Sequence, residues 1–210
     1  MSSLDNSNQV MMLLLELRKL GIIDSKILEA LTSVNRVDFL PEKFKGFSYE
    51  DASLEIFKGV ETTKILDLGK MILLILKNNK NTKSALEIGT GSGLLTAILS
   101  KIYERVYSVE INKESYIFSK NLLKNISDRI FLRLADGKKG WQEVSPFDAI
   151  YIDACVENSV TSLLKNQLSR FGAIVYAKNF SGQQFYCLDK NENDFNTLKS
   201  NFKVRRTMLV

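Results

Sequence analysis

Short apolar runs alternate with segments of helical periodicity along residues 84–177. The runs have the length of strands, and between them apolar residues recur every three or four positions, as on one face of a helix. The expected strands are 84–88, 106–110, 130–134, 147–152 and 172–177, and the expected helices are 94–102, 114–125 and 158–168. Two more strands, 184–189 and 202–210, are expected to close the sheet, with 194–201 between them as a helix or turn. The pattern predicts an α/β fold, doubly wound around a seven-stranded, mostly parallel sheet.

The first part of the chain is patterned for helices instead. The expected elements are helices at 7–20, 24–31 and 65–77, a helical turn opened by Pro41 and an extended piece at 54–57. Asp24 can cap the second of these helices, because its carboxylate can accept from the first free N–H groups. We therefore expect residues 1–80 to form a helical leader with a loop, packed on the α/β core at 81–210 as a single compact unit.

The core opens on a strand, a tight turn and the start of a helix. After the acid Glu87, glycines stand at alternate positions, Gly89, Gly91 and Gly93. Glycine lets the backbone adopt positive φ and leaves room for a ligand to approach. The helix that follows presents free N–H groups at its first turn. The stretch therefore predicts a nucleotide-binding turn, although an ordinary glycine-rich connection is the alternative.

The spacing of the glycines distinguishes two classes of nucleotide ligand. A dinucleotide fingerprint needs its third glycine at position 94, where this chain has Leu94. The pattern E-x-G-x-G-x-G instead resembles the first motif of S-adenosylmethionine (SAM) methyltransferases with a Rossmann-like fold. That resemblance implies SAM as the cofactor, bound by Glu87, Gly89, Thr90, Gly91 and Gly93.

A second acid supports this interpretation. Glu110 ends the next predicted strand, 21 residues after Gly89. An acid at that place can accept both ribose hydroxyls of a nucleotide, although a solvated surface acid is the alternative. Gly89, Glu110, Asp136 and Asp153 all follow or end predicted strands. The carboxyl ends of parallel strands meet at one edge of a sheet, so one cleft can collect all four.

Composition narrows the classes of function. Net charge is +5 with a pI of about 9.1, but the basic residues are scattered, so we expect no nucleic-acid partner. The longest apolar runs are far shorter than the roughly 20 residues that span a bilayer, so we expect no membrane association. The two cysteines suggest no disulfide framework, which fits the cytoplasm. We further expect a monomer.

The chain contains no histidine. Histidine-based metal sites and Ser–His or Cys–His nucleophilic pairs are therefore excluded, and we expect no metal. No side chain has an ordinary pKa near neutrality. If the protein is an enzyme, its reaction should proceed without a histidine base.

Several motifs together resemble one family over nearly the whole chain. They are Gly-Ile-Ile-Asp at 21–24, Val-Asn-Arg-Val-Asp-Phe-Leu-Pro at 34–41, Tyr-Glu-Asp at 49–51, the glycine loop at 86–93 and the pair Asp136 and Gly137. These motifs are similar to those of the protein-L-isoaspartate O-methyltransferases. The resemblance implies that Asp136 and Gly137 lie on the adenine side of SAM.

The resemblance also implies a reaction, which is transfer of the SAM methyl group to the free carboxylate of L-isoaspartyl residues in damaged proteins, a step in protein repair. Isoaspartyl-containing proteins or peptides would be the partners. A carboxylate with a pKa of about 4 is already anionic at neutral pH, so it needs no general base. Holding it in line with the methyl group can supply about 7–11 kcal/mol of the barrier reduction. A chain without histidine suits this reaction.

The chain departs from the family in the active loop, which there reads G-Q-T-I-S-Q-P. The aligned stretch here is 59–65, which the resemblance makes the substrate-side loop of the leader. Thr63 stands at the position of the serine and is the candidate catalytic residue. Thr63 keeps a hydroxyl that can bind a carboxylate, but its methyl group stiffens χ1. Ile65 replaces the proline, and Glu61 adds a negative charge. Asp153 stands where the family has small or neutral residues.

Two other functions remain open at this point. Residues 147–154 resemble the fourth strand of catechol-type O-methyltransferases, in which the final acid, here Asp153, binds magnesium. That family needs Asp-Asn at the end of its fifth strand, where this chain has Lys178 and Asn179, and a lysine is unfavourable beside a divalent cation. Lys178 could instead pair with a substrate carboxylate or lie exposed, and Asp153 could be a cofactor-side acid. The altered loop also allows a SAM-binding relative without catalysis.

Overall fold

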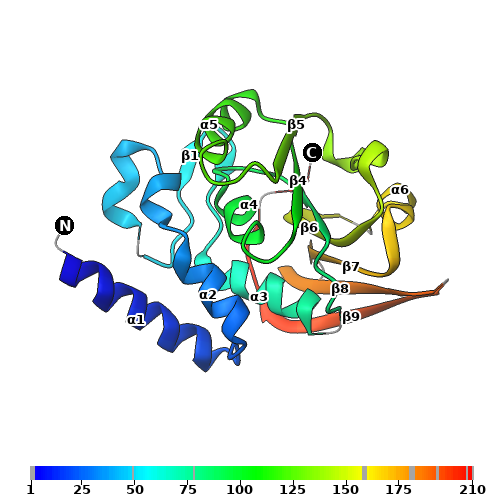
Figure 1. Cartoon of the computed structure of the whole chain (residues 1–210), viewed down its shortest axis with the longest axis horizontal. Helices are drawn as coiled ribbons and strands as arrows, with labels where there is room; N and C mark the ends of the chain where they lie inside the picture. The colour runs from blue at the N-terminus through cyan, green and yellow to red at the C-terminus, as the bar shows by residue number, and fades with distance from the viewer. Residues whose placement is uncertain are drawn as a thin grey trace.

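The computed structural model of the chain describes residues 3–48, 50–77, 79–157, 160–179, 183–192, 194–206 and 208–209, with the backbone alone at 3–7 and 179. A seven-stranded sheet forms its centre, in the order β5-β4-β3-β6-β7-β8-β9 (Figure 1). The strands are β3 (Ser84–Ile88), β4 (Arg105–Glu110), β5 (Ile130–Leu134), β6 (Phe147–Val156), β7 (Leu168–Asn179), β8 (Gln183–Asn191) and β9 (Asp194–Lys203). The five strands from β5 to β7 are parallel, and β8 and β9 pair antiparallel. The predicted fold class is confirmed.

The order of the strands locates the ligand edge. From β3 the chain moves outward to β4 and then β5, and it returns across the sheet to add β6 on the other side of β3. In open α/β sheets the crevice at such a reversal, outside the carboxyl ends of the strands, is where ligands bind. The glycine loop follows β3 and so lies at this reversal.

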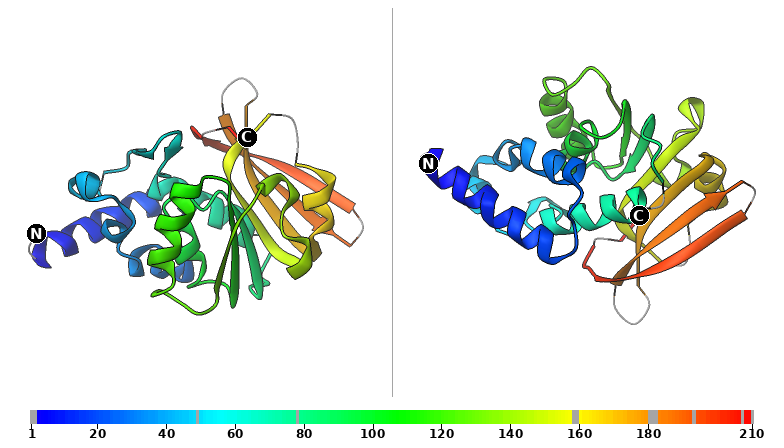
Figure 2. Two further views of the ribbon diagram at one scale, coloured as in Figure 1. Left: turned by 90° about the horizontal axis from the view of Figure 1, so that it is seen from above. Right: turned by 60° about the horizontal axis from the view of Figure 1, so that its bottom comes forward.

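Helices and short 3₁₀ turns cover both faces. They are α1 (Ser3–Lys19), α2 (Ser25–Ser33), α3 (Ile65–Leu76), α4 (Leu94–Leu99), α5 (Lys113–Leu123), α6 (Ser162–Asn166), and the turns η1 (Arg36–Phe39), η2 (Glu42–Phe47), η3 (Gly137–Lys139) and η4 (Gln142–Val144). A two-stranded ribbon, β1 (Glu55–Phe57) with β2 (Val60–Glu61), precedes α3. Figures 1 and 2 show α1 at one end of the molecule and the β8–β9 hairpin at the other. Within the described residues, no helix is both long and apolar enough to cross a bilayer.

Strand residues largely alternate between two apolar clusters. On β3, Ala85 belongs to the cluster shared with α1 to α4, whereas Leu86 and Ile88 belong to the cluster shared with α6. The same alternation holds for Tyr151 and its neighbour Ile150 on β6. The helices of the leader therefore bury their apolar faces in the same cluster as one face of the sheet, which fixes the loop before α3 relative to the strand ends.

The leader helices form largely where the pattern predicts them. Asp24 caps α2 by accepting from the N–H groups of Lys26 at 2.9 Å and Ile27 at 3.3 Å. The predicted helix at 65–77 is α3. Pro41 immediately precedes η2, as expected.

Three predictions of secondary structure need correction. The prediction of a helix or turn at 194–201 is wrong, because this stretch belongs to β9; its apolar spacing resembles a helix, but it is an edge strand with nearly all side chains exposed. The predicted strand at 202–210 contributes only its first two residues to β9. The helix expected at 158–168 is shorter, Ser162–Asn166, and Asn158 and Ser159 lie outside the described residues.

Candidate active site

The glycine loop between β3 and α4 has the backbone that its sequence predicts. Gly89, Gly91 and Gly93 all have positive φ, at 90°, 53° and 88°. A Cβ at Gly91 would meet nothing within 4 Å, so this part of the loop faces open space. A Cβ at Gly93 would lie 3.0 Å from Leu123 on α5. Gly91 therefore leaves room for a ligand, whereas Gly93 lets the loop pack on α5.

Glu110 at the end of β4 holds this loop. Its Oε2 accepts from the Gly91 N–H at 2.7 Å, and its Oε1 accepts from the Asn112 N–H at 2.8 Å. Each carboxylate oxygen can accept a second hydrogen bond. Glu110 thus lies where the sequence predicts a ribose-binding acid, beside the open face of Gly91.

Glu87 lies beneath the loop and not in the open part of the site. Its side chain is fully buried, and its Oε2 accepts from Thr96 Oγ1 and from Ser108 Oγ, the latter at 2.8 Å. Because Ser108 uses its proton on Glu87, Thr90 Oγ1 donates to Ser108 Oγ at 2.6 Å. Burial raises the pKa of Glu87 to about 8, and the nearby Asp153 and Glu110 add to the shift.

Asp136 and Gly137 follow β5 at the same edge of the sheet. Asp136 Oδ1 accepts from the Lys138 N–H at 2.9 Å and caps η3. A Cβ at Gly137 would lie 2.3 Å from Ile88 Cγ2. The glycine is thus required here by packing against β3, which the sequence motif alone does not indicate.

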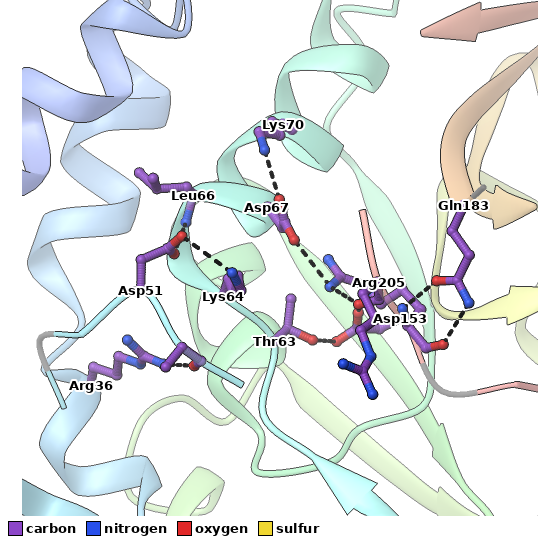
Figure 3. A network of polar contacts seen from close by, with 12 residues as sticks. Arg36, Asp51, Thr63, Lys64, Leu66, Asp67, Lys70, Asp153, Gln183 and Arg205 are labelled. Atoms are coloured by element: carbon purple, nitrogen blue, oxygen red, sulfur yellow. Dashed lines mark hydrogen bonds and ion pairs between the residues drawn. The ribbon is translucent and has the colours of Figure 1, made fainter. Parts of the chain in front are cut away.

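Thr63 and Asp153 meet across the crevice. Thr63 Oγ1 donates to Asp153 Oδ2 at 2.5 Å, and Figure 3 shows the two side chains pointing toward each other. Asp153 lies in β6 at a break in the register with β7, between Tyr151 and Cys155. Such an irregularity re-aims side chains at the end of a strand. One recess of about 20 Å³ is lined by Thr63, Asp153 and the loop residue Gly91.

A buried ion-pair network continues behind Asp153. Arg206 Nε lies 3.1 Å from Asp153 Oδ1, and Arg206 Nη1 donates to Asp67 Oδ2 at 3.2 Å. Asp67 in turn accepts from Lys70 Nζ at 2.8 Å, as Figure 3 shows. The network connects α3, β6 and the end of the chain around the hydroxyl of Thr63.

Two of the leader motifs brace the loop that carries Thr63. Arg36, from the motif at 34–41, is buried and donates to the carbonyl oxygens of Glu50 at 2.5 Å and Ala52 at 3.1 Å. Asp51, from the motif at 49–51, contacts both sides of the helix start (Figure 3). Its Oδ2 lies 4.0 Å from Lys64 Nζ, and its Oδ1 accepts from the Leu66 backbone N–H at 3.5 Å. Tyr49 lies outside the described residues. Arg36 thus fixes the segment that carries Asp51, and Asp51 contacts the start of α3, two residues after Thr63.

Sequence reasoning missed Arg206 and Asp67. Neither residue belongs to a motif, and Arg206 lies 143 positions after Thr63 in the sequence. The one available signal was Asp153 itself, because an acid at the end of an apolar strand is costly to bury without a cation.

A larger cavity of about 520 Å³ lies away from the glycine loop, between α1, α2 and the turn at Arg36.

Comparison with known proteins identifies the family of this chain. The family model described as Protein-L-isoaspartate(D-aspartate) O-methyltransferase matches residues 7–210. A protein-L-isoaspartate O-methyltransferase from Pseudoalteromonas atlantica is 31% identical over 181 residues, which are 86% of this chain and 85% of the relative. One from Yersinia enterocolitica is 35% identical over 184 residues, 87% of each protein.

Solved structures show the same fold. A protein-L-isoaspartate O-methyltransferase superposes with a TM-score of 0.83 at 20% identity, over 97% of this chain and 65% of the other. A Plasmodium falciparum structure described by the same activity, in complex with S-adenosyl-L-homocysteine, has a TM-score of 0.77 at 21% identity, over 94% of this chain and 96% of the other. With the family model spanning nearly its whole length, this chain belongs to the protein-L-isoaspartate (D-aspartate) O-methyltransferase family.

Proposed function

We propose that this protein transfers the methyl group of SAM to the free carboxylate of L-isoaspartyl residues in damaged proteins. The observation that carries the proposal is that the glycine loop and Thr63 line one recess. The side of the site that is expected to hold the methyl donor thus borders the side that is expected to hold the acceptor. Family membership supports the same activity, and it makes SAM the cofactor.

The residues at the strand ends fit SAM. Gly91 faces open space, which leaves room for the nucleoside, and Glu110 has acceptor capacity for ribose hydroxyls. We propose that these residues bind the cofactor together with Gly89, Thr90, Gly93, Asp136 and Gly137, and that Glu87 acts from beneath the loop. When bound, SAM supplies an electrophilic methyl group on a sulfonium.

The chain's own residues need only to hold the acceptor. The isoaspartyl carboxylate is anionic at neutral pH, since its pKa is about 4. Its oxygen forms the new C–O bond with a lone pair, the electrons of the broken C–S bond stay on sulfur, and no proton moves. Thr63 can donate a hydrogen bond to the second carboxylate oxygen and fix the angle of attack. Orientation of this kind is worth about 7–11 kcal/mol in well-aligned reactions.

The magnesium-dependent alternative is disfavoured by the surroundings of Asp153. The guanidinium of Arg206 lies 3.1 Å from Asp153 Oδ1, and the side chain of Arg206 is buried. A divalent cation on this carboxylate would have to sit beside that fixed positive charge. Magnesium dependence of turnover would restore the alternative.

The remaining features are proposed from the sequence. We propose a cytoplasmic monomer that acts on proteins and not on nucleic acid, because the basic residues are scattered and the cysteines suggest a reducing compartment. We also propose that residues 1–80 act with 81–210 as one unit, since the leader helices and the sheet share one apolar cluster.

The test of the activity uses labelled SAM with two peptides that differ only in an isoaspartyl or a normal aspartyl linkage. Base-labile methyl ester on the isoaspartyl peptide alone is the expected result. Ester on neither peptide, with a melting temperature that rises with SAM, would instead identify a non-catalytic SAM-binding protein. Ester on both peptides would contradict the proposed specificity.

A further inference from the structure

The hydroxyl of Thr63 is already committed in this structure. A threonine hydroxyl has one proton to donate, and here Thr63 donates it to Asp153 Oδ2. Thr63 therefore cannot donate to a substrate carboxylate while Asp153 stays where it is. Either Thr63 does not bind the substrate, or the substrate carboxylate takes the place of Asp153.

The partners of Asp153 favour the second possibility. Its two oxygens are contacted by a hydroxyl, Thr63 Oγ1 at 2.5 Å, and by a guanidinium, Arg206 Nε at 3.1 Å. A hydroxyl and a guanidinium that converge on one carboxylate are the donor set expected for recognition of any carboxylate. This site lies beside Gly91, at the edge of the sheet where the methyl donor is expected.

Arg206 also has donors that no group in the described part of the chain uses. Its side chain is buried and the residue is 7% exposed, yet Nη2 has no hydrogen-bond partner. Nε lies close to Asp153 Oδ1 but is not aligned for a hydrogen bond. Two donor nitrogens of the guanidinium, Nε and Nη2, therefore lack a hydrogen-bond acceptor among the described residues. A buried, under-used guanidinium is costly unless a ligand completes it.

The backbone holds Arg206 firmly in this place. The carboxamide of Gln183 accepts from the Arg206 N–H and donates to the Arg206 carbonyl oxygen, the latter at 3.0 Å. Further along, Leu209 donates to the Cys155 carbonyl oxygen at 2.8 Å, beside the bridge between Cys155 and Met208. The segment that contains Arg206, Met208 and Leu209 is thus bonded to its neighbours next to Asp153, which fixes the position of the guanidinium.

We propose that Thr63 and Arg206 form the receptor for the isoaspartyl carboxylate, and that Asp153 occupies this receptor until the substrate displaces it. The inference rests on the proposed function, because it assigns the acceptor side of that same site. Arg206 is then a substrate-binding residue, and Asp153 is an internal competitor that sets how tightly a carboxylate must bind to enter.

The charge change of the reaction predicts a kinetic signature. The acceptor carboxylate carries its full charge in the ground state, and part of that charge is lost as it bonds to the methyl carbon of a sulfonium. Arg206 therefore stabilises the bound substrate at least as well as the transition state. Removing an interaction of this kind raises KM without lowering kcat.

The experiment measures KM and kcat for an isoaspartyl peptide, and the dissociation constant of SAM, in wild type and in Arg206→Met, Asp153→Asn and the double variant. Arg205→Met is the matched control, because it removes the same charge from an exposed neighbour. We expect Arg206→Met to raise KM at least about tenfold, as for a lost charge-assisted hydrogen bond. We expect kcat to fall less than about threefold and SAM affinity to match that of Arg205→Met. Asp153→Asn should lower KM, and it should no longer do so in the Arg206→Met background.

Three outcomes would overturn the inference. The first is an active wild type in which Arg206→Met has the KM of Arg205→Met. The second is an Asp153→Asn variant in which KM stays constant or rises, and this variant decides the matter if Arg206→Met does not fold. The third is a wild type without isoaspartyl-dependent turnover, which removes the proposed function as well. The first two leave that function intact, so the failures are distinguishable.

Discussion

The backbone N–H of Gly91 donates to Glu110 Oε2 at 2.7 Å, so one carboxylate joins the end of β4 to the glycine loop that follows β3. The acid proposed to bind the ribose therefore also fixes the loop around it. We therefore expect cofactor affinity and loop geometry to be coupled through this single side chain.

Replacing Glu110 with alanine should weaken SAM binding by at least about tenfold, since charge-assisted hydrogen bonds are each worth about 1.5–3 kcal/mol. The same variant should lose about 1–3 kcal/mol of stability, because the partly buried N–H of Gly91 loses its acceptor. Calorimetric titration and denaturant unfolding measure the two effects. Glu104→Ala, an exposed acid just before the same strand, serves as the control and should change neither. Unchanged SAM affinity in Glu110→Ala would remove this residue from the cofactor site.

Two glycines of the site should respond differently to alanine. Gly137→Ala places a Cβ against Ile88 and should cost about 1–3 kcal/mol of stability, as overpacking does. Gly91→Ala meets no neighbour, but its φ of 53° disfavours an L side chain by about 1–2 kcal/mol. Its methyl group would project into the space proposed for the nucleoside. We therefore expect Gly91→Ala to lose more SAM affinity than Gly137→Ala. An equal loss of affinity in both variants, measured by titration of the folded proteins, would contradict this division.

Glu87 gives the stability a predictable dependence on pH. Its pKa is raised to about 8 in the folded protein by burial, from an ordinary value of 4.5. Between pH 4.5 and pH 8 the unfolded chain loses a proton from Glu87 that the folded chain keeps. The contribution of the neutral acid to the free energy of unfolding is therefore at its full value below about pH 4.5 and decreases as the pH rises toward 8. Glu87→Gln cannot titrate. Its free energy of unfolding, relative to wild type, should therefore rise from pH 5 to pH 8 by an amount on the order of a few kcal/mol. A difference that is constant over this range, measured by denaturant unfolding, would show that Glu87 is ionised in the fold.

Thr63→Ala should lower kcat/KM for the isoaspartyl peptide by about 10–100-fold, as expected for the loss of one hydrogen bond to a charged group. SAM affinity should stay within a few-fold, because the hydroxyl contacts Asp153 and not the glycine loop. Thr63→Ser keeps the hydroxyl and relieves the crowding of the threonine methyl, so we expect activity at or above wild type. Steady-state kinetics and titration with SAM separate the two parameters. A wild-type kcat/KM in Thr63→Ala would exclude the residue from the mechanism.

The positions of the glycine loop and Glu110, the proposed cofactor side, could be predicted from local patterns because these residues lie in short stretches at strand ends. The glycine loop and Glu110 each follow a β-rich run, and parallel strands bring such ends together. These features depend on residues close in sequence, so spacing alone carries them.

The acceptor side could not be predicted in the same way. The ion pair of Asp153 with Arg206 joins β6 to the end of the chain, and no periodicity links the two. Hydrophobic patterning also does not give the buried face of α5: Ser115 and Ser119 are buried with Leu123, whereas the larger Tyr116 and Phe118 are only partly buried. Small serines are needed where the helix passes Gly93, a tertiary requirement that hydrophobic patterning does not encode.

A crystal structure with S-adenosyl-L-homocysteine tests the central claim most directly. The account predicts that the ribose hydroxyls bind Glu110, that the nucleoside lies along Gly91, and that the sulfur faces Thr63 across the recess that the two residues share. The contrary result is a crevice at the strand ends that stays empty or filled by the protein's own side chains at saturating ligand.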